Sequence, residues 1–483
     1  MEQARMKDNR IAGARRKLSN KKRRHLAPAL LERIQPDAAG IDCGATSHFV
    51  AVPRDRDPQP VREFRTFTAD LKRLADWLVK CRVKTVAIES TGVYWIPVYE
   101  ILEERGLEVV LVNARDVHNV RGRKSDVKDC EWLQELHSVG LLRPSFRPAA
   151  EIVALRAYVR HRQSLIEAAA TAIQRMQKAL TQMNVQLHHV LSDLTGVTGL
   201  AIVRDILAGV RDPQALAAHR DRRCQASEQE IAGALTGNYR AEHLFVLGQN
   251  FAAYQFNQRQ MADCDSAIEA QLADLARKRQ APKTALPAAR RRSRPSKNEP
   301  RLELRSPLHR ITGGADLSQI NAIGPYGALQ IIAEIGTDMS RWPTAKNFAS
   351  WTTLAPNNKV SGGRLLSSRT QPSANRVAAI LRRAAMSASR SNTALGAFYR
   401  RLAYRVGQAK AITATARKLA VLVYRVLRGD ITYHDPGAAA YQDRHRTRVL
   451  GNLSQRARRL GFALVNIQTG QVLDQTALPQ PVS

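Results

Sequence analysis

Two long segments in which apolar residues recur at alternating spacings of three and four residues constrain the fold of this chain most strongly. The first covers residues 152–190 and is interrupted at Arg162. The second covers residues 247–275 and is interrupted at Gln258 and Asp265. This spacing predicts two long amphipathic helices. They can pair as an antiparallel hairpin, pair with copies from another chain, or belong to a helical bundle, and periodicity alone does not decide between these arrangements.

The charge balance favours a polyanionic partner. Over 483 residues, 75 Lys and Arg stand against 42 Asp and Glu, which gives a formal net charge of +33 and a pI near 10.8. A charge of this sign and size is typical of proteins that bind nucleic acid. Much of it falls in residues 1–37 and in the proline-containing segment 277–315. Each segment is interpreted either as a flexible, solvated stretch or as an arm that grips phosphates, since composition does not separate the two.

The sequence contains no apolar run of about 18 residues and no apolar core of a signal peptide, so we expect no membrane span and a cytoplasmic, nucleoid-associated protein. Its five cysteines lie far apart without a CxxC pair. This spacing argues against a zinc knuckle and against a disulfide framework.

Residues 38–150 alternate between strand-like and helix-like patterns. The apolar runs AGIDCGA, SHFVAVP, VREFRTF, KTVAIES and EVVLVN predict strands. The stretches TADLKRLADWLVKC, GVYWIPVYEILEERG and DVKDCEWLQELHSVG predict helices placed after the third, fourth and fifth strands. This order predicts an α/β domain built on a mixed sheet.

Four acidic residues occupy unusual places in this domain. Asp42 and Glu89 interrupt apolar strands, where an unpaired charge is costly, and Asp126 and Asp129 lie three residues apart at a helix start. If the fold brings the four carboxylates together, they repel and raise one another's pKa unless cations lie among them. Ligands that are all oxygen suit Mg²⁺ or Mn²⁺. Two such ions would form a clamp for phosphodiester chemistry. For Asp126 and Asp129 alone, a favourable helix dipole or an ion pair with a basic neighbour is the favoured explanation, but it does not explain Asp42 and Glu89.

The segments GIDCGATSHFVAV, AIESTGVYWIPVYEIL and VLVNARDVHNVRGRKSDVKDCEWLQELHSVGLLRPSF carry a family resemblance. They resemble the ribonuclease H-like (RuvC-like) domain of DEDD-type insertion-sequence transposases of the insertion-sequence family one-ten. Asp42, Glu89, Asp126 and Asp129 match the order D, E, D, D of that domain and are therefore the candidate catalytic and metal-binding residues. The basic residues that precede the last two acids are candidates for nucleic-acid contacts: Arg121, Arg123 and Lys124.

A third block, residues 316–430, begins with DLSQINAIGPYGALQIIAEIGTD. The glycine at Gly324, followed by Pro325 and an apolar helix, resembles a helix-hairpin-helix turn in which backbone N–H groups face a DNA phosphate. An ordinary turn between helices has the same pattern. Gly324 is therefore a candidate nucleic-acid contact.

Farther along this block, a Ser-Gly-Gly stretch precedes a helix that contains arginines. A serine in a glycine-rich loop is usually a turn residue. In the resembled family, however, a C-terminal serine transposase domain carries this pattern, which makes Ser361 the candidate nucleophile. The residues that we expect to contact nucleic acid around it are Gly362, Gly363, Arg364 and Arg382. Where relatives have a glycine-containing turn, this chain has SSRTQPSANR, and Ser367 and Ser368 are alternative nucleophiles.

The resemblance implies a transposase or site-specific recombinase that joins DNA through a serine–DNA intermediate, assisted by Mg²⁺ at the carboxylates. It also implies a bridge RNA that selects DNA sites, and a homo-oligomer, dimer or tetramer. A metal-dependent hydrolytic nuclease or Holliday-junction resolvase of the same fold would need the acids and not Ser361. A non-catalytic nucleic-acid-binding protein would need neither.

The predicted organisation follows from these patterns. The parts are a basic tail (1–37), a RuvC-like DEDD domain (38–150), a helical coiled-coil connector (151–276), a basic linker (277–315), a mainly α-helical serine transposase domain (316–430) and a C-terminal tail (431–483).

Overall fold

The computed structural model describes residues 32–90, 92–113, 126–290 and 297–472. The chain divides into two compact units, Met1–Arg147 and Pro148–Ser483. Each unit is described by itself. The boundary between them falls near residue 150, where the strand pattern of the sequence gives way to the long helical period.

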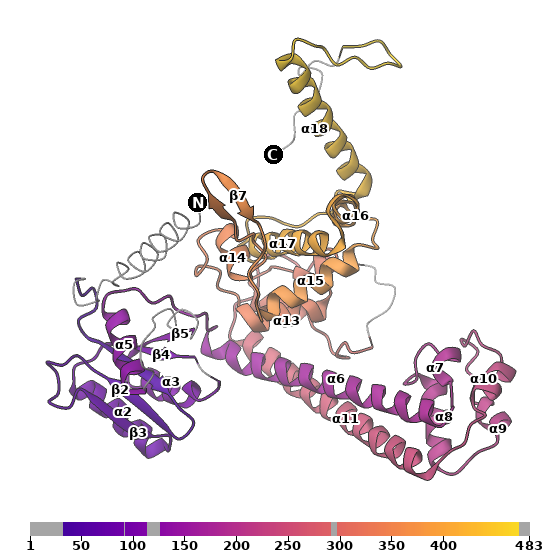
Figure 1. Cartoon of the computed structure of the whole chain (residues 1–483), viewed down its shortest axis with the longest axis horizontal. Helices are drawn as coiled ribbons and strands as arrows, with labels where there is room; N and C mark the ends of the chain where they lie inside the picture. The colour runs from indigo at the N-terminus through magenta and orange to yellow at the C-terminus, as the bar shows by residue number, and fades with distance from the viewer. Residues whose placement is uncertain (1–31, 91, 114–125, 291–296, 473–483) are drawn as a thin grey trace, which may run out of the picture. The chain divides into compact units, whose positions relative to one another are not determined.

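The first unit is built on a five-stranded mixed sheet (Figure 1). Its strand order is β3-β2-β1-β4-β5; β1, β4 and β5 run parallel, whereas β2 and β3 form antiparallel neighbours. The predicted α/β class with a mixed sheet is therefore confirmed. The elements are β1 (Ala38–Cys43), β2 (Ser47–Ala51), β3 (Val61–Arg65), α2 (Thr68–Lys80), β4 (Thr85–Glu89), α3 (Trp95–Glu104), β5 (Glu108–Val112) and α5 (Asp126–Ser138).

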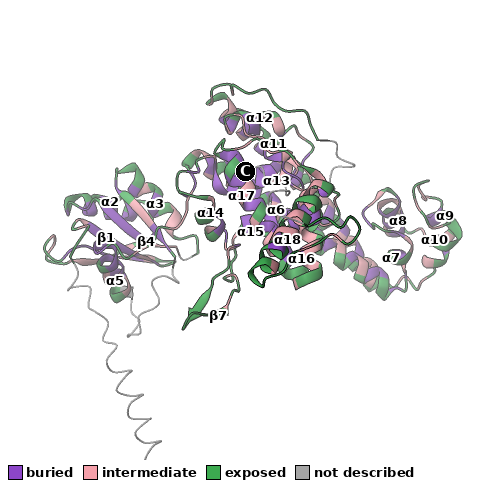
Figure 2. Cartoon of the chain, turned by 90° about the horizontal axis from the view of Figure 1, so that it is seen from above, coloured by how far each residue is buried: buried purple, intermediate pink, exposed green. Residues whose placement is uncertain are grey.

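Helices cover both faces of this sheet (Figure 2). Strand residues such as Ile41 and Ile88 pack with the apolar sides of α2 and α3. Strand residues on the other face of the sheet, such as Ala87, pack with Leu133 of α5. Because strand side chains alternate between the two faces, Asp42 and Glu89 project on the same side as Ala87, the side that α5 covers.

Two long helices, α6 (Ala150–Gln182) and α11 (Ala241–Arg277), run antiparallel in the second unit (Figure 1). The sequence left the pairing of its two long helices open, and here they pair within one chain. The observed helix α6 ends at Gln182, before the predicted end at residue 190, because the chain turns at Asn184, whose φ is +58°. These helices are amphipathic, and none of the helices in the described part is long and apolar enough to cross a membrane.

The polar interruptions of the two apolar runs meet in the structure. The Arg162 guanidinium, 3% exposed, donates to the Asp265 carboxylate at 2.5 Å. It also donates to the Asn298 carbonyl at 2.8 Å and to the Tyr326 hydroxyl at 3.1 Å. A buried charge of this kind is tolerated because several hydrogen bonds satisfy it. Arg162 thus ties both long helices to the segment after residue 296 and to α13 (Pro325–Ile335).

A small group of helices closes the far end of this pair (Figure 1). It consists of α7 (Leu187–Val190), α8 (Val197–Leu207), α9 (Pro213–Ala217) and α10 (Glu228–Ala234). Their apolar residues share one core with α6 and α11.

The rest of the second unit is mainly helical, as predicted for the C-terminal region. One helix, α12, lies inside the segment predicted as a basic linker, and its Leu308 and Ile311 are buried. The elements are α12 (Arg305–Ile311), the 3₁₀ segment η2 (Leu317–Gln319), α13, α14 (Ala345–Trp351), β6 (Lys359–Ser361), β7 (Arg364–Ser367), α15 (Arg376–Ala388), α16 (Ala394–Val406), α17 (Gln408–Leu427) and α18 (Gly437–Arg459).

Candidate active site

Two of the predicted acids lie at the ends of adjacent parallel strands. Strand β1 pairs with β4 so that Ile41 lies opposite Ile88, and the next positions along the two strands are Asp42 and Glu89. Both side chains are half-buried and project from the face that α5 covers. The carboxyl ends of parallel strands therefore place these two carboxylates side by side at one edge of the sheet.

The charges of these acids raise the pKa of neighbouring thiols. Burial raises the pKa of Cys43, and the negative charges of Asp42 and Glu89 raise it further. Burial, then Glu131 and then Asp42, raise the pKa of Cys130, in α5, to about 12. The charge of Asp42 thus acts both within the sheet and on α5, so these acids share one electrostatic environment with the start of that helix.

The position of α5 is fixed by a close approach at Gly40. A Cβ atom at this glycine would lie 2.4 Å from the Gln134 amide nitrogen and 2.5 Å from the Cys130 carbonyl oxygen. The Gln134 side chain also donates to the Ala38 carbonyl at 3.1 Å. These contacts hold the helix backbone against β1, and Asp129, half-buried, lies in the first turn of that helix.

The structure describes no side chain for the remaining predicted residues of this region. Arg121, Arg123 and Lys124 lie outside the described residues, and so does the side chain of Asp126, whose backbone begins α5. Within residues 32–90, 92–113, 126–290 and 297–472, no group of three or more His, Cys, Asp or Glu is arranged to hold a metal ion. The structure thus brings Asp42 and Glu89 together and leaves the four-carboxylate site a prediction.

We expect Gly40→Ala to destabilise the first unit by about 3 kcal/mol, because the new methyl group would press on the backbone of α5 and no side chain can rotate away. The measurement is chemical denaturation of the full chain. The control is Gly233→Ala in α10, where the added methyl meets nothing within 4 Å and should be neutral or slightly stabilising. Equal stability of the two variants would contradict the close approach of α5 to β1.

Ser361, in the second unit, belongs to a β-hairpin (Figure 2). It is the last residue of β6 and the register partner of Arg364, the first residue of β7. Gly362 and Gly363 form the turn with φ of +55° and +75°, values that glycine adopts without strain. Directly opposed residues of a hairpin project to the same face, so the exposed side chains of Ser361 and Arg364 lie on one side.

The other predicted contacts of the second unit are distributed along its elements. Gly324 is the N-cap of α13 with Pro325 as the first helical residue, and the short 3₁₀ segment η2 precedes it. Arg382 lies half-buried on α15, the helix that follows the hairpin. The alternative nucleophile Ser367 ends β7, and Ser368 follows it. Ser361 and Arg364 are thus the predicted pair that local structure joins.

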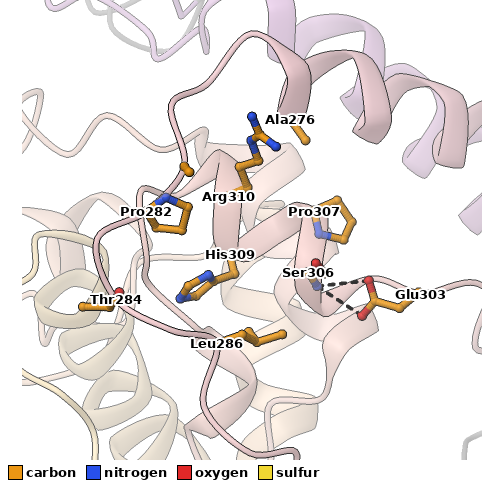
Figure 3. A pocket seen from close by; sticks show the side chains of 10 residues that line it. Ala276, Pro282, Thr284, Leu286, Glu303, Ser306, Pro307, His309 and Arg310 are labelled. Carbon is orange, nitrogen blue, oxygen red and sulfur yellow. Dashed lines mark hydrogen bonds between the residues drawn. The ribbon is translucent and has the colours of Figure 1, made fainter.

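A cavity of about 410 Å³ lies elsewhere in the second unit, between helix α12 and the segment that follows α11 (Figure 3). Pro282 and Pro307 line it together with His309, which is 5% exposed. Among the described residues, the Nε2 atom of His309 has no hydrogen-bond partner. None of the predicted catalytic residues lines this cavity.

Sequence reasoning missed the helix α18, which lies in the segment predicted as a C-terminal tail. Its sequence carries six arginines and one acid, Asp443. Arginines four residues apart, as at Arg444 and Arg448, are the signal that could have revealed one basic helical face.

Comparison with known families identifies the class. A DEDD-type transposase model matches residues 39–185, and the model described as the transposase IS116/IS110/IS902 family matches residues 314–400. No curated protein matches the chain significantly. A DEDD-type domain followed by this second domain defines a DNA transposase, an enzyme of DNA recombination that acts on DNA. The chain belongs to the IS110 family of transposases, and the resemblance noted from its sequence is confirmed.

Proposed function

We propose that this transposase cuts and rejoins DNA through a covalent intermediate on Ser361, with divalent metal ions held by Asp42, Glu89, Asp126 and Asp129. The observation that carries the proposal is the placement of Asp42 and Glu89 at adjacent parallel-strand ends, beneath a helix whose first turn contains Asp129. A mixed sheet of this order, with an antiparallel pair followed by parallel strands, supports a ribonuclease H-like domain.

The donor atoms fit a hard cation. Carboxylate oxygens are the ligands that Mg²⁺ and Mn²⁺ prefer, and the mutual repulsion of adjacent carboxylates favours cation binding. When bound, such ions act as Lewis acids toward phosphoryl oxygens. The role of the chain is to hold these oxygens on two strand ends and one helix, so that the site is set before DNA arrives.

The serine step conserves a phosphoester bond. The Ser361 Oγ atom attacks the phosphorus, a new O–P bond forms, and the bond from phosphorus to the leaving sugar oxygen breaks. The hydroxyl proton ends on the released sugar hydroxyl. Because a phosphodiester remains, attack by another sugar hydroxyl restores a DNA strand without ATP. Arg364, opposite Ser361 in the hairpin, is suited to bind the phosphate oxygens during this exchange.

The remaining residues and partners of the proposal follow the family resemblance. Candidate DNA contacts are Arg121, Arg123, Lys124, Gly324, Gly362, Gly363 and Arg382. Gly324 opens α13, where free backbone N–H groups suit a phosphate, as in a helix-hairpin-helix turn. A bridge RNA would choose the DNA sites. The α6–α11 pair would act as a coiled-coil connector in a dimer or tetramer.

The test of the proposal is the fate of the cut strands. Wild-type protein is incubated with DNA carrying candidate element ends, the candidate guide RNA and Mg²⁺, without ATP, and the products are sequenced. Strands joined to new partners are the expected result. Hydrolysed ends without any joined product would instead assign a metal-dependent nuclease or resolvase.

A further inference from the structure

Helices α16, α17 and α18 adjoin one another in the second unit (Figure 1) and are rich in basic residues. Their sequences contain three, four and six Lys or Arg, respectively, against a single acid, Asp443. These helices therefore carry an excess of twelve positive charges, more than a third of the net +33 of the chain. The family models end at residue 400, so α17 and α18 lie beyond the matched part.

Several of these cations converge where α18 packs on α16. Arg401 of α16 donates to the Tyr441 hydroxyl at 2.9 Å and lies 3.0 Å from the His445 Nε2 atom, both residues of α18. Lys418 of α17 lies 4.4 Å from the centre of the Phe398 ring. Arg401 also lies over the Phe398 and Tyr441 rings, 5.9 and 5.8 Å from their centres. Aromatic rings thus hold the cations in place.

Mutual repulsion operates within this group. Partial desolvation, and then the charges of Arg448, Arg401 and Arg444, lower the pKa of Lys418. Desolvation, and then Arg401, Arg448 and Arg405, lower the pKa of His445. Among the described residues, no acid forms an ion pair with Arg401, Lys418, Arg444 or Arg448. Like charges held together in this way favour the binding of a polyanion.

The arginines continue along one side of α18. Arg444 and Arg448 are exposed and one turn apart, and Arg459 returns to nearly the same side. On this side Asn452 and Gln455 separate Arg448 from Arg459, so the continuous basic part is the turn from Arg444 to Arg448, about 6 Å long at about 1.5 Å per residue. A nucleic-acid strand advances about 3.4 Å per nucleotide, so these two arginines can contact neighbouring phosphates of one backbone.

We propose that the α16–α18 basic cluster, defined as Arg401, Arg405, Lys418, Arg444 and Arg448, is a binding surface for the phosphodiester backbone of a nucleic acid. None of its residues belongs to the set proposed for strand cutting. The surface recognises its ligand through the charge of the phosphates. DNA and RNA offer the same backbone charge, and the test distinguishes them.

The test measures the salt dependence of binding for the full chain by fluorescence anisotropy. One probe is a 30-base-pair DNA duplex, and the other is an RNA hairpin with a stem of related sequence. In Arg444→Gln/Arg448→Gln, two phosphate contacts are lost, and the slope of log K against log salt should become shallower by about 1.8. Both side chains are exposed, so the fold should be retained.

The matched control is Arg240→Gln/Arg277→Gln, which removes the same charge from arginines beside their own acids, Glu242 and Asp274. A shallower slope in the first variant alone supports the surface, and the probe that shows it identifies DNA, RNA or both as the ligand. An unchanged slope with both probes, or an equal change in the control, overturns the proposal. Ser361→Ala should keep the wild-type slope, so the outcome is independent of the proposed serine chemistry.

Discussion

Asp42→Asn is expected to abolish DNA cleavage while the protein stays folded. Loss of one charged metal ligand from the proposed carboxylate site should remove about 4 kcal/mol of transition-state stabilisation. This corresponds to about a thousandfold slower cleavage. The amide has nearly the shape of the carboxylate, and it removes the repulsion between two carboxylates at adjacent strand ends. The melting temperature should therefore be unchanged or higher.

The measurement pairs the initial rate of strand cleavage with thermal unfolding of the same preparation. Asp76→Asn provides a matched control, because Asp76 is an exposed acid on α2 that forms an ion pair with Arg105. This control should keep the wild-type rate. If Asp42→Asn cleaved DNA at the wild-type rate with Mg²⁺ present, Asp42 would not be a catalytic residue.

Ser361→Ala is expected to eliminate strand joining, with a loss of about a thousandfold or more, because no hydroxyl remains to carry the DNA strand. The side chain is exposed in a hairpin, so the free energy of unfolding should change by no more than about 0.5 kcal/mol. Nucleic-acid binding should persist, since the arginines around it are untouched. Joined products quantified by sequencing provide the measurement.

Two further variants separate this role from that of nearby hydroxyls. Ser367→Ala and Ser368→Ala change serines of the same hairpin region and should keep the joining activity. Loss of joining in either of them, together with normal joining by Ser361→Ala, would transfer the nucleophile to another serine.

The sequence predicts the helices and strands of the first unit, but it does not predict which of them pack against each other. Asp42 and Glu89 were recognisable because each interrupts an apolar strand, where an acid needs a reason. Their side-by-side placement depends on the parallel pairing of β1 with β4, which brings together residues far apart in the chain. The role of Gly40 was hidden for a similar reason, since GIDCG predicts a strand and says nothing of the helix packed on it.

Other differences between the predicted and the observed structure have local causes. The Ser-Gly-Gly stretch predicts a glycine-rich loop and forms a β-hairpin instead. A two-residue Gly-Gly turn between two strands is also a hairpin signal. Helix α12 was hidden in a basic, proline-containing segment, although Leu304, Leu308 and Ile311 share a helical spacing. Few side chains of α18 are buried. Its sequence therefore lacks the apolar face from which most helices are predicted.

The pairing of Arg162 with Asp265 shows how a broken pattern can be informative. Each residue interrupts an apolar run, and either one alone suggests a weak helix. In the structure the two interruptions satisfy each other at 2.5 Å across the antiparallel helices. Complementary charges at matching distances from the ends of two runs could have predicted the antiparallel pairing.

The central claim, a serine–DNA intermediate, is tested most directly by identifying the residue that carries DNA. Wild-type protein is stopped during reaction with Mg²⁺, DNA and the candidate guide RNA, the DNA is trimmed by nuclease, and peptides are analysed by mass spectrometry. We expect a nucleotide attached to the peptide that contains Ser361, at Ser361 itself. Cleaved and rejoined DNA with no nucleotide on the protein, or a nucleotide on a different residue, would contradict it.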